Sequence, residues 1–283
     1  MTSPEAVAAA VDRLASAQAT LVPCAAVRDL IGTDDLAAAY AVQQVLVQAR
    51  IAGGVSVVGR KIGATSEAVQ RQLGVDQPDF GYLLSDMDVS DGASDAGSDA
   101  GSDTGGKPIS MRTLVQPRVE AEVAFVLARD IDVPEDEITL DLVRSAVDVA
   151  LPALEIVDSR IESWDIGFTD TVADNASSGL FVVGRDGRPL GAVEDGGVEP
   201  RDVVMSLTIN GEERSAGTGA ACLGDPLEAL RWLAVQASRF GDPLRAGHLI
   251  LSGALGPFVP FAPGDRVTAS ISGFAPLTVS FED

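Results

Sequence analysis

The stretch Arg118-Val-Glu-Ala-Glu-Val-Ala-Phe-Val-Leu127 alternates apolar side chains with others, and two of those others are glutamates. This alternation predicts a half-buried β-strand. Because successive side chains of a strand point to opposite faces, Glu120 and Glu122 share one face, with their Cα atoms about 6.5 Å apart. Two carboxylates held that close repel each other, which costs little if both face water, and a shared divalent cation would turn the repulsion into coordination.

A third glutamate favours the cation. Glu155 lies within Ala150-Leu-Pro-Ala-Leu-Glu-Ile-Val-Asp158, with apolar residues on both sides. A carboxylate in such a run is costly to bury unless it is paired, hydrogen-bonded or metal-bound. The chain has one histidine and two well-separated cysteines, which argues against sites built on His and Cys. An all-oxygen site for Mg²⁺, Mn²⁺ or Ca²⁺ remains, although the pair Glu120 and Glu122 taken alone favours a solvated strand face.

The two lysines differ in their surroundings. Of the 20 basic residues 18 are arginine, which leaves Lys61 and Lys107. Arginine keeps its proton in proteins, whereas a buried lysine shifts its pKa readily and can transfer a proton. Lys107 lies in a polar linker and is interpreted as a solvated charge. Lys61 follows an apolar strand predicted at Val55–Val58, where that strand is expected to end, and both a surface lysine and a proton carrier fit this position.

Composition limits the classes of partner. The 283 residues carry a net charge of −22, which argues against binding to nucleic acid or to an anionic membrane. Two cysteines, the lack of a leader pattern and the lack of a long apolar run predict a reduced, cytoplasmic protein. An anionic substrate would then need a local cation in order to bind.

Helical and strand patterns are segregated along the chain. After two N-terminal helices, expected from Ser3 to Ala17 and from Asp34 to Ile51, strand patterns dominate the second half, which favours an α+β fold with a curved antiparallel or mixed sheet. Further helices are expected at Leu140–Ala150 and Asp225–Phe240. The expected strands are Val119–Leu127, Gly179–Val183, Val203–Ile209, His248–Ser252, Arg266–Ile271 and Leu277–Phe281.

A low-complexity segment separates two larger regions. Between Asp88 and Lys107 the sequence repeats Ser, Asp, Gly and Ala, and so little apolar mass predicts a mobile acidic loop. The four-residue Asp spacing lacks the ligand pattern of a calcium-binding EF-hand loop. The expected organisation is an N-terminal helical and strand region at residues 1–87 that contributes Lys61, an acidic loop insertion at 88–110, and a β-rich, metal-binding catalytic core at 111–283.

Six segments, in order, resemble the 2-keto-4-pentenoate hydratase family, which has the fumarylacetoacetate hydrolase-like fold and includes 2-hydroxypenta-2,4-dienoate hydratases and 4-oxalocrotonate decarboxylases. The resemblance covers nearly the whole chain, and the acidic loop is the main departure. It implies a mixed β-sheet roll with N-terminal helices. The segments are Gly59-Arg-Lys-Ile-Gly-Ala-Thr-Ser66, Gly74-Val-Asp-Gln-Pro-Asp-Phe-Gly81, Gln116-Pro-Arg-Val-Glu-Ala-Glu122, Leu154-Glu-Ile-Val-Asp158, Asp170-Thr-Val-Ala-Asp-Asn-Ala-Ser-Ser178 and Gly247-His-Leu-Ile-Leu-Ser-Gly-Ala-Leu-Gly256.

The resemblance also implies residue roles. A divalent metal, Mg²⁺ or Mn²⁺, would be held by the family's three glutamates, the catalytic lysine would be Lys61, and Asp79 would be the aspartate of the Pro-Asp-aromatic-Gly motif. Ser177 and Ser252 fall in segments that the family places near substrate. The metal ligands carried over in this way are Glu120, Glu122 and Glu155. A homo-oligomer is expected, with association to a downstream aldolase or a paralogous decarboxylase.

The implied reaction adds water to 2-hydroxypenta-2,4-dienoate, giving 4-hydroxy-2-oxopentanoate, in the meta-cleavage catabolism of aromatic or steroid rings. The closest alternative is decarboxylation of 4-oxalocrotonate, whose distal carboxylate needs a cationic or donor-rich pocket. Trp164, Ile166 and Phe168 favour a short uncharged tail and therefore the hydratase. Hydrolysis of a C–C bond ranks third, and a non-catalytic, metal-binding partner subunit is the remaining hypothesis.

Overall fold

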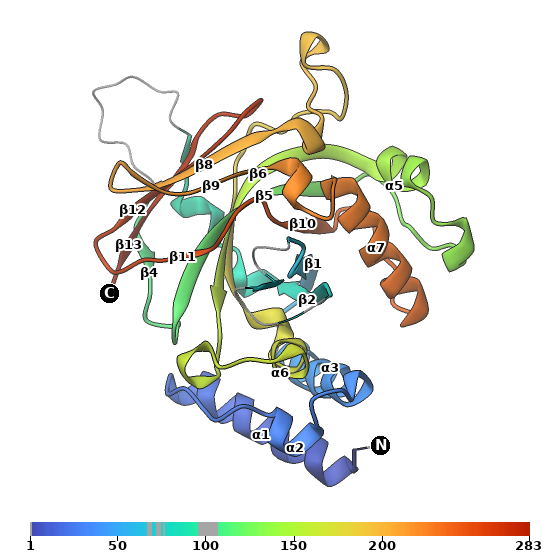
Figure 1. Cartoon of the computed structure of the whole chain (residues 1–283), viewed down its shortest axis with the longest axis vertical. Coiled ribbons are helices and arrows are strands. Elements are labelled where there is room, and N and C mark those ends of the chain that lie inside the picture. Colours follow the sequence, from blue (N-terminus) through green and yellow to red (C-terminus); the bar gives the residue numbers. More distant parts are fainter. Residues whose placement is uncertain (1, 67–69, 72–74, 76, 96–106) are drawn as a thin grey trace.

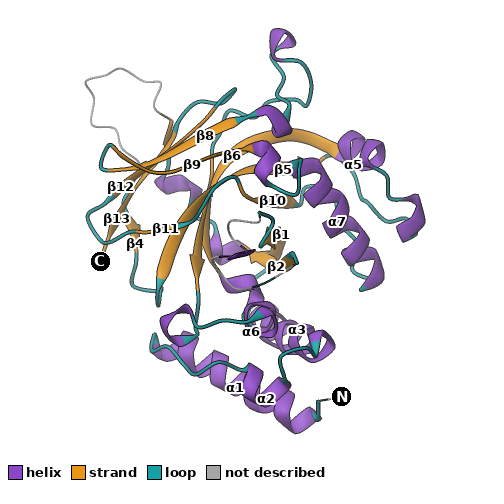
Figure 2. Ribbon diagram, in the orientation of Figure 1, coloured by secondary structure: helices purple, strands orange, loops and turns teal. Residues whose placement is uncertain are grey.

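The computed structural model describes residues 2–66, 70–71, 75, 77–95 and 107–283, and combines helices and strands in separate layers (Figures 1 and 2). Its helices are α1 (Pro4–Thr20), α2 (Arg28–Ile31), α3 (Leu36–Ala52), α5 (Leu140–Ala146), α6 (Phe168–Ala173) and α7 (Pro226–Arg239). Its strands are β1 (Val57–Gly63), β2 (Asp79–Leu84), β3 (Ser94–Asp95), β4 (Ile109–Ser110), β5 (Pro117–Leu127), β6 (Val147–Asp158), β7 (Ser178–Val183), β8 (Val204–Ile209), β9 (Glu212–Thr218), β10 (Leu249–Ala254), β11 (Val259–Pro260), β12 (Arg266–Ile271) and β13 (Leu277–Glu282). This composition confirms the expected α+β class.

The larger sheet carries the residues of interest. Within the described residues its strands follow the order β2-β1-β10-β5-β6-β7, and β11 adds to β5. Strand β1 pairs with β10 in parallel and the other pairs are antiparallel, so the sheet is mixed, as expected. Strands β5 and β6 are the longest and curve through the centre of the molecule (Figure 2).

A second sheet packs against the outer face of the first. Its strands follow the order β3-β13-β12-β8-β9, with β4 beside β13. Apolar residues of both sheets, together with α5 and α7, bury a common core that includes Val123, Phe125, Leu207 and Val267. The odd-numbered residues of β5 face this core. The even-numbered residues, Glu120 and Glu122 among them, therefore face the opposite side, toward β1 and α3.

The N-terminal helices form a layer at one end of the larger sheet (Figure 1). Ser3 accepts a hydrogen bond from the backbone N–H of Ala6, and Pro4 occupies the first turn, so α1 begins where the sequence predicts it. The helices α1, α2, α3 and α6 enclose a cluster that includes Leu14, Ile31 and Val42. None of the helices in the described ranges is both long and apolar enough to cross a membrane.

Three local expectations were wrong. Strand β5 is buried on both faces rather than half-buried, because the helices and β1 cover the side that carries the glutamates. The helix expected to reach Ala150 ends at Ala146, where the chain passes directly into β6. Strand β1 extends to Gly63, so Lys61 lies inside a strand that is paired on both sides, not at its end.

The acidic segment is only partly described. At its edges, β3 and β4 both pair with β13, so these edges belong to the second sheet instead of a loop. The mobile loop expected between them falls on residues 96–106, outside the described residues. The division at residues 87 and 111 stays a prediction, although β1 and β2 belong to the same sheet as β5 and β6.

Candidate metal centre and active site

Three buried glutamates converge on the inner face of the larger sheet. Glu120 lies directly opposite Glu155 in the antiparallel pairing of β5 with β6, and Glu122 lies two residues farther along β5, on the same face. Each offers a carboxylate oxygen, and these oxygens lie within 4.8 Å of one another. Their exposed fractions are 5%, 0% and 1% for Glu120, Glu122 and Glu155. Bulk solvent therefore does not screen their charges.

The protein leaves several of these oxygens without a hydrogen-bond donor. The backbone N–H of Gly253 donates to Glu122 Oε2 at 2.7 Å, but Glu122 Oε1 and Glu155 Oε2 have no hydrogen-bond partner within the described residues, and Glu155 Oε1 has only its ion pair with Lys61. Burial is the largest cause that raises the pKa of each glutamate, and the neighbouring carboxylates add to it for Glu120 and Glu122. Unpartnered, mutually repelling oxygens of this kind fit a divalent cation, which would satisfy them as ligands.

Lys61 lies beside the glutamates and is itself buried. Its Nζ is 3.2 Å from Glu155 Oε1 and donates to the carbonyl oxygen of Ala176 at 3.0 Å. Burial by itself lowers the pKa of Lys61, but the surrounding carboxylates, Glu155 first, raise it above its ordinary value. Lys61 is therefore not a surface lysine, and its role as a proton carrier stays a prediction.

Asp79 begins β2 and faces the last residue of β1. It pairs in register with Gly63, and Thr171 Oγ1 donates to its Oδ2 at 3.0 Å. A Cβ built on Gly63 would lie 2.1 Å from Asp79 Oδ1 and 3.3 Å from Lys61 Nζ, so glycine allows both groups to share this space. Burial raises the pKa of Asp79, and Lys61 opposes that shift.

A strained turn brings two more groups to the site. Asn175, Ala176 and Ser177 are consecutive non-glycine residues with φ of 55°, 52° and 51°, a conformation that is costly for each of them. Asn175 fixes the turn by exchanging two hydrogen bonds with the backbone of Tyr82. The turn directs the Ala176 carbonyl toward Lys61 and places Ser177 Oγ 3.4 Å from Thr171 Oγ1. Strain held in place in this way is typical of functional sites.

A cavity of about 20 Å³ lies among these groups. Of the residues that the sequence singled out, Lys61, Asp79, Glu120 and Ser177 line it. Glu122, Glu155 and Ser252 do not line it. The buried Oγ of Ser252 has no hydrogen-bond partner within the described residues, and the next residue, Gly253, donates its backbone N–H to Glu122. The full lining is Lys61, Gly63, Ala64, Asp79, Glu120, Val157, Trp164, Thr171, Ala176, Ser177 and Phe258.

The apolar side of this cavity differs from the expected one. Trp164 lines it, but Ile166 and Phe168 pack with the N-terminal helices and do not reach it. Phe258 and Val157 take their place and form a small cluster with Trp164. Sequence reasoning also missed Thr171, which lies within a quoted segment but carries no charge that would distinguish it from other buried threonines.

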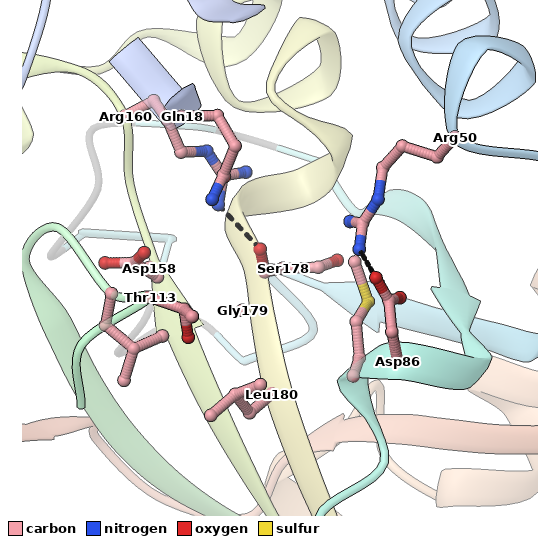
Figure 3. Close-up of a pocket in the computed structure, with 11 residues that line it drawn as sticks. Gln18, Arg50, Asp86, Thr113, Asp158, Arg160, Ser178, Gly179 and Leu180 are labelled. Carbon is pink, nitrogen blue, oxygen red and sulfur yellow. Dashed lines mark hydrogen bonds and ion pairs between the residues drawn. The ribbon is translucent and has the colours of Figure 1, made fainter. Parts of the chain in front are cut away.

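Larger cavities lie away from this chemistry. One of about 220 Å³ lies between the ends of α1, α3 and β6 and the start of β7 (Figure 3). Its arginines are already engaged, since Arg160 pairs with Asp174 and donates to the carbonyl of Ser178, and Arg50 pairs with Asp86. With these charges satisfied inside the protein, the glutamate cluster remains the better candidate for the active site.

The chain is similar to several known proteins. The family model described as fumarylacetoacetate (FAA) hydrolase C-terminal matches residues 67–282. The TodF product hydratase of Pseudomonas putida is 47% identical over 276 residues, covering 98% of this chain and 95% of the relative. The 2-keto-4-pentenoate hydratase of Paraburkholderia xenovorans is 48% identical over 260 residues, covering 92% and 89%.

A solved structure gives the same fold. The 4-oxalocrotonate decarboxylase from Pseudomonas putida G7, complexed with magnesium and adipate, superposes with a TM-score of 0.85 at 30% identity and covers 99% of both chains. The α+β class and the mixed sheet expected from the sequence are therefore confirmed.

Proposed function

The chain belongs to the fumarylacetoacetate hydrolase family, and we propose that it is a metal-dependent 2-keto-4-pentenoate hydratase, a lyase that adds water to 2-hydroxypenta-2,4-dienoate to give 4-hydroxy-2-oxopentanoate. The observation that carries the proposal is the identity of 47% and 48% to relatives named as hydratases, over nearly the whole chain. The buried set Lys61, Asp79, Glu120, Glu122 and Glu155 supports it.

The proposed cofactor is Mg²⁺ or Mn²⁺, held by Glu120, Glu122 and Glu155. These three carboxylates and Asp79 are opposed by only one lysine in the described part of the site, so a bound divalent cation would offset the excess negative charge. When bound, it would supply the positive charge that an anionic 2-oxo acid needs and would polarise its 2-oxygen. Oxygen ligands alone suit both ions.

The proton chemistry falls to Lys61 and Asp79. Conversion of the dienol to the conjugated 2-oxo-3-ene removes a proton from the 2-hydroxyl and adds one at C5, and hydration then adds the oxygen of water at C4 and a proton at C3. Lys61, held by Glu155 and the Ala176 carbonyl, is proposed to carry these protons. Asp79, fixed by Thr171, orients Lys61 or acts as the second acid or base. Ser177 is proposed to contact substrate, because it lines the same cavity.

Decarboxylation of 4-oxalocrotonate remains the alternative, since the decarboxylase from Pseudomonas putida G7 shares the fold over 99% of both chains. Its 30% identity is well below that of the hydratases, which favours hydration.

The test follows the ultraviolet absorbance of freshly generated 2-hydroxypenta-2,4-dienoate with the purified protein and Mg²⁺ or Mn²⁺, with and without EDTA. The hydratase predicts metal-dependent loss of the dienol band and a product heavier by one water. Loss of carbon dioxide from 2-oxohex-3-enedioate, without turnover of the dienoate, would reassign the protein as a decarboxylase. If the folded, metal-loaded chain turns over neither compound, the remaining hypothesis is that it is a non-catalytic partner subunit.

The proposed setting is a cytoplasmic homo-oligomer in meta-cleavage catabolism, associated with a downstream aldolase or paralogous decarboxylase. Apolar side chains on the N-terminal helical layer support self-association: Val22 is 61% exposed and Val45 is 48% exposed. Light scattering of the purified chain would test this part of the proposal.

A further inference from the structure

We infer that Arg118, with Trp164 and Phe258, forms a subsite for the tail of the substrate, in which the guanidinium group receives a distal carboxylate. The site would then bind 2-oxo dicarboxylates more tightly than 2-oxo acids of the same length whose tail is uncharged. This inference rests on the proposed function, because it takes the glutamate cluster as the end of the site that binds the 2-oxo acid group.

Arg118 points to the same side of the sheet as the glutamates. It lies two residues before Glu120 on β5, and side chains two apart on a strand share a face. Its partners across the sheet are Val157 on β6 and Pro260 on β11, and Val157 lines the cavity of the candidate site. Arg118 is therefore two residues along the strand from Glu120, the nearest proposed metal ligand, and next to the wall of the cavity.

The guanidinium group stacks on the two aromatic residues of that wall. Its central carbon is 4.4 Å from the ring centre of Trp164 and 4.9 Å from that of Phe258, and the two rings lie 5.5 Å apart. Trp164 is fixed in this position, because its Nε1 donates to the carbonyl of Gln116 at 2.9 Å. Stacking fixes the plane of the guanidinium group and leaves the N–H groups at its edge available.

Arg118 has no carboxylate partner in the described part of the chain. Ten other arginines there form ion pairs with aspartate or glutamate, in a protein with 42 acidic residues. Arg118 is also partly buried, and burial lowers its pKa from the ordinary value. A half-buried guanidinium group with free donors, beside an active-site cavity, is suited to bind an anion that comes from outside the protein.

The depth of the site indicates which end of a ligand would reach Arg118. Glu122 and Glu155 are fully buried, whereas Trp164 and Arg118 are partly exposed. A 2-oxo acid whose carboxylate and 2-oxygen bind at the glutamate cluster would therefore extend its tail toward Trp164, Phe258 and Arg118. A short uncharged tail would contact the aromatic rings, and a longer tail that ends in a carboxylate would meet the guanidinium group.

A matched pair of ligands tests this inference. 2-Oxoadipate and 2-oxohexanoate have the same six-carbon chain and the same 2-oxo acid group, and differ only in ending with a carboxylate or a methyl group. Their affinities for the Mg²⁺-loaded protein are measured by calorimetric titration for wild type, Arg118→Gln and Arg118→Lys. The control is Arg214→Gln, which removes the same charge from an exposed position on β9. Circular dichroism checks that each variant is folded.

The expected result is that Arg118→Gln weakens binding of 2-oxoadipate by about tenfold and changes binding of 2-oxohexanoate by less than about twofold. Arg118→Lys should restore part of the difference, and Arg214→Gln should change neither affinity. Equal weakening of both ligands would mean that Arg118 only supports the aromatic wall, and would overturn the inference. So would a wild-type protein that hydrates the dienoate but binds 2-oxoadipate no better than 2-oxohexanoate. Failure to hydrate the dienoate would instead count against the proposed function.

Discussion

Replacing Gly63 by alanine should disable the site without removing the metal ligands. A Cβ at this position would lie 2.1 Å from Asp79 Oδ1, where an ordinary contact begins near 3.4 Å. The carboxylate would have to retreat by about 1.3 Å, because the strand pairing of Gly63 with Asp79 fixes both backbones. The same Cβ would lie 3.3 Å from Lys61 Nζ, which is also a tight contact.

The size of the effect follows from that displacement. A shift of about 1 Å in a catalytic group can cost on the order of 10²-fold in rate. Moving Asp79 also breaks its 3.0 Å hydrogen bond from Thr171. We therefore expect Gly63→Ala to lower kcat by about 10²-fold, while the affinity for Mg²⁺ stays near that of wild type, because no glutamate oxygen is among the three atoms nearest the new Cβ.

The assay measures kcat and KM for hydration of 2-hydroxypenta-2,4-dienoate, Mg²⁺ affinity by calorimetry, and the melting temperature. The matched control is Gly167→Ala, where a new Cβ would meet its nearest atom at 3.5 Å and φ is −100°. The control should keep wild-type kcat. A folded Gly63→Ala variant with kcat within about twofold of wild type would refute the placement of Asp79 and Lys61 beside the reacting atoms.

Three further predictions concern the same cluster. Lys61→Met should lower turnover by about 10²- to 10⁴-fold while Mg²⁺ still binds in calorimetry, so a variant with near-full rate would exclude Lys61 as the proton carrier. Glu122→Gln should weaken Mg²⁺ binding and turnover together, and an active variant that needs no metal would contradict the ligand set. Without metal, the melting temperature should fall as the pH rises from about 6 to about 9. Burial raises the pKa of Glu120, Glu122 and Glu155, so the folded state holds their protons more tightly than the unfolded chain. This stabilisation is complete below their ordinary pKa of 4.5 and is lost progressively as the pH rises through their raised pKa, which is about 8 for Glu120. Saturating Mg²⁺ should remove most of that fall. A melting temperature that does not change with pH in EDTA would contradict the raised pKa of the buried carboxylates.

Much of the fold could be predicted from sequence periodicity. Strands β8 and β12 alternate between buried and more exposed residues, and both strands, together with β13, lie within one residue of their expected bounds. Strand β6 was missed because its residues are apolar nearly throughout, and a continuous apolar run cannot be assigned to helix or strand by period alone. The strand predicted at the position of β1 was too short for a related reason. Arg60 and Lys61 look like the polar end of a strand, yet both are buried by partners distant in sequence.

The site was predictable only where charge and spacing carry information. Two glutamates two residues apart on a strand must share a face, so their proximity follows from the sequence. That Glu155 lies opposite Glu120 depends on the register between β5 and β6, which the sequence does not specify. Thr171 and Phe258 reach the cavity through tertiary packing alone, and an uncharged side chain carries no sign of this in the sequence.

Strand β5 shows why the proposed site depends on the register between β5 and β6. Its even-numbered positions carry Arg118, Glu120 and Glu122 toward the site, about 6.5 Å apart in Cα position, while its odd-numbered positions fill the core between the two sheets. A one-residue slip against β6 would turn all three charged groups into that apolar core and move Val119 and Ala121 to the site. The cost of burying those charges unpaired therefore excludes a one-residue slip. The two-residue spacing of the stretch that predicts the strand therefore also places the proposed tail subsite next to the proposed metal ligands.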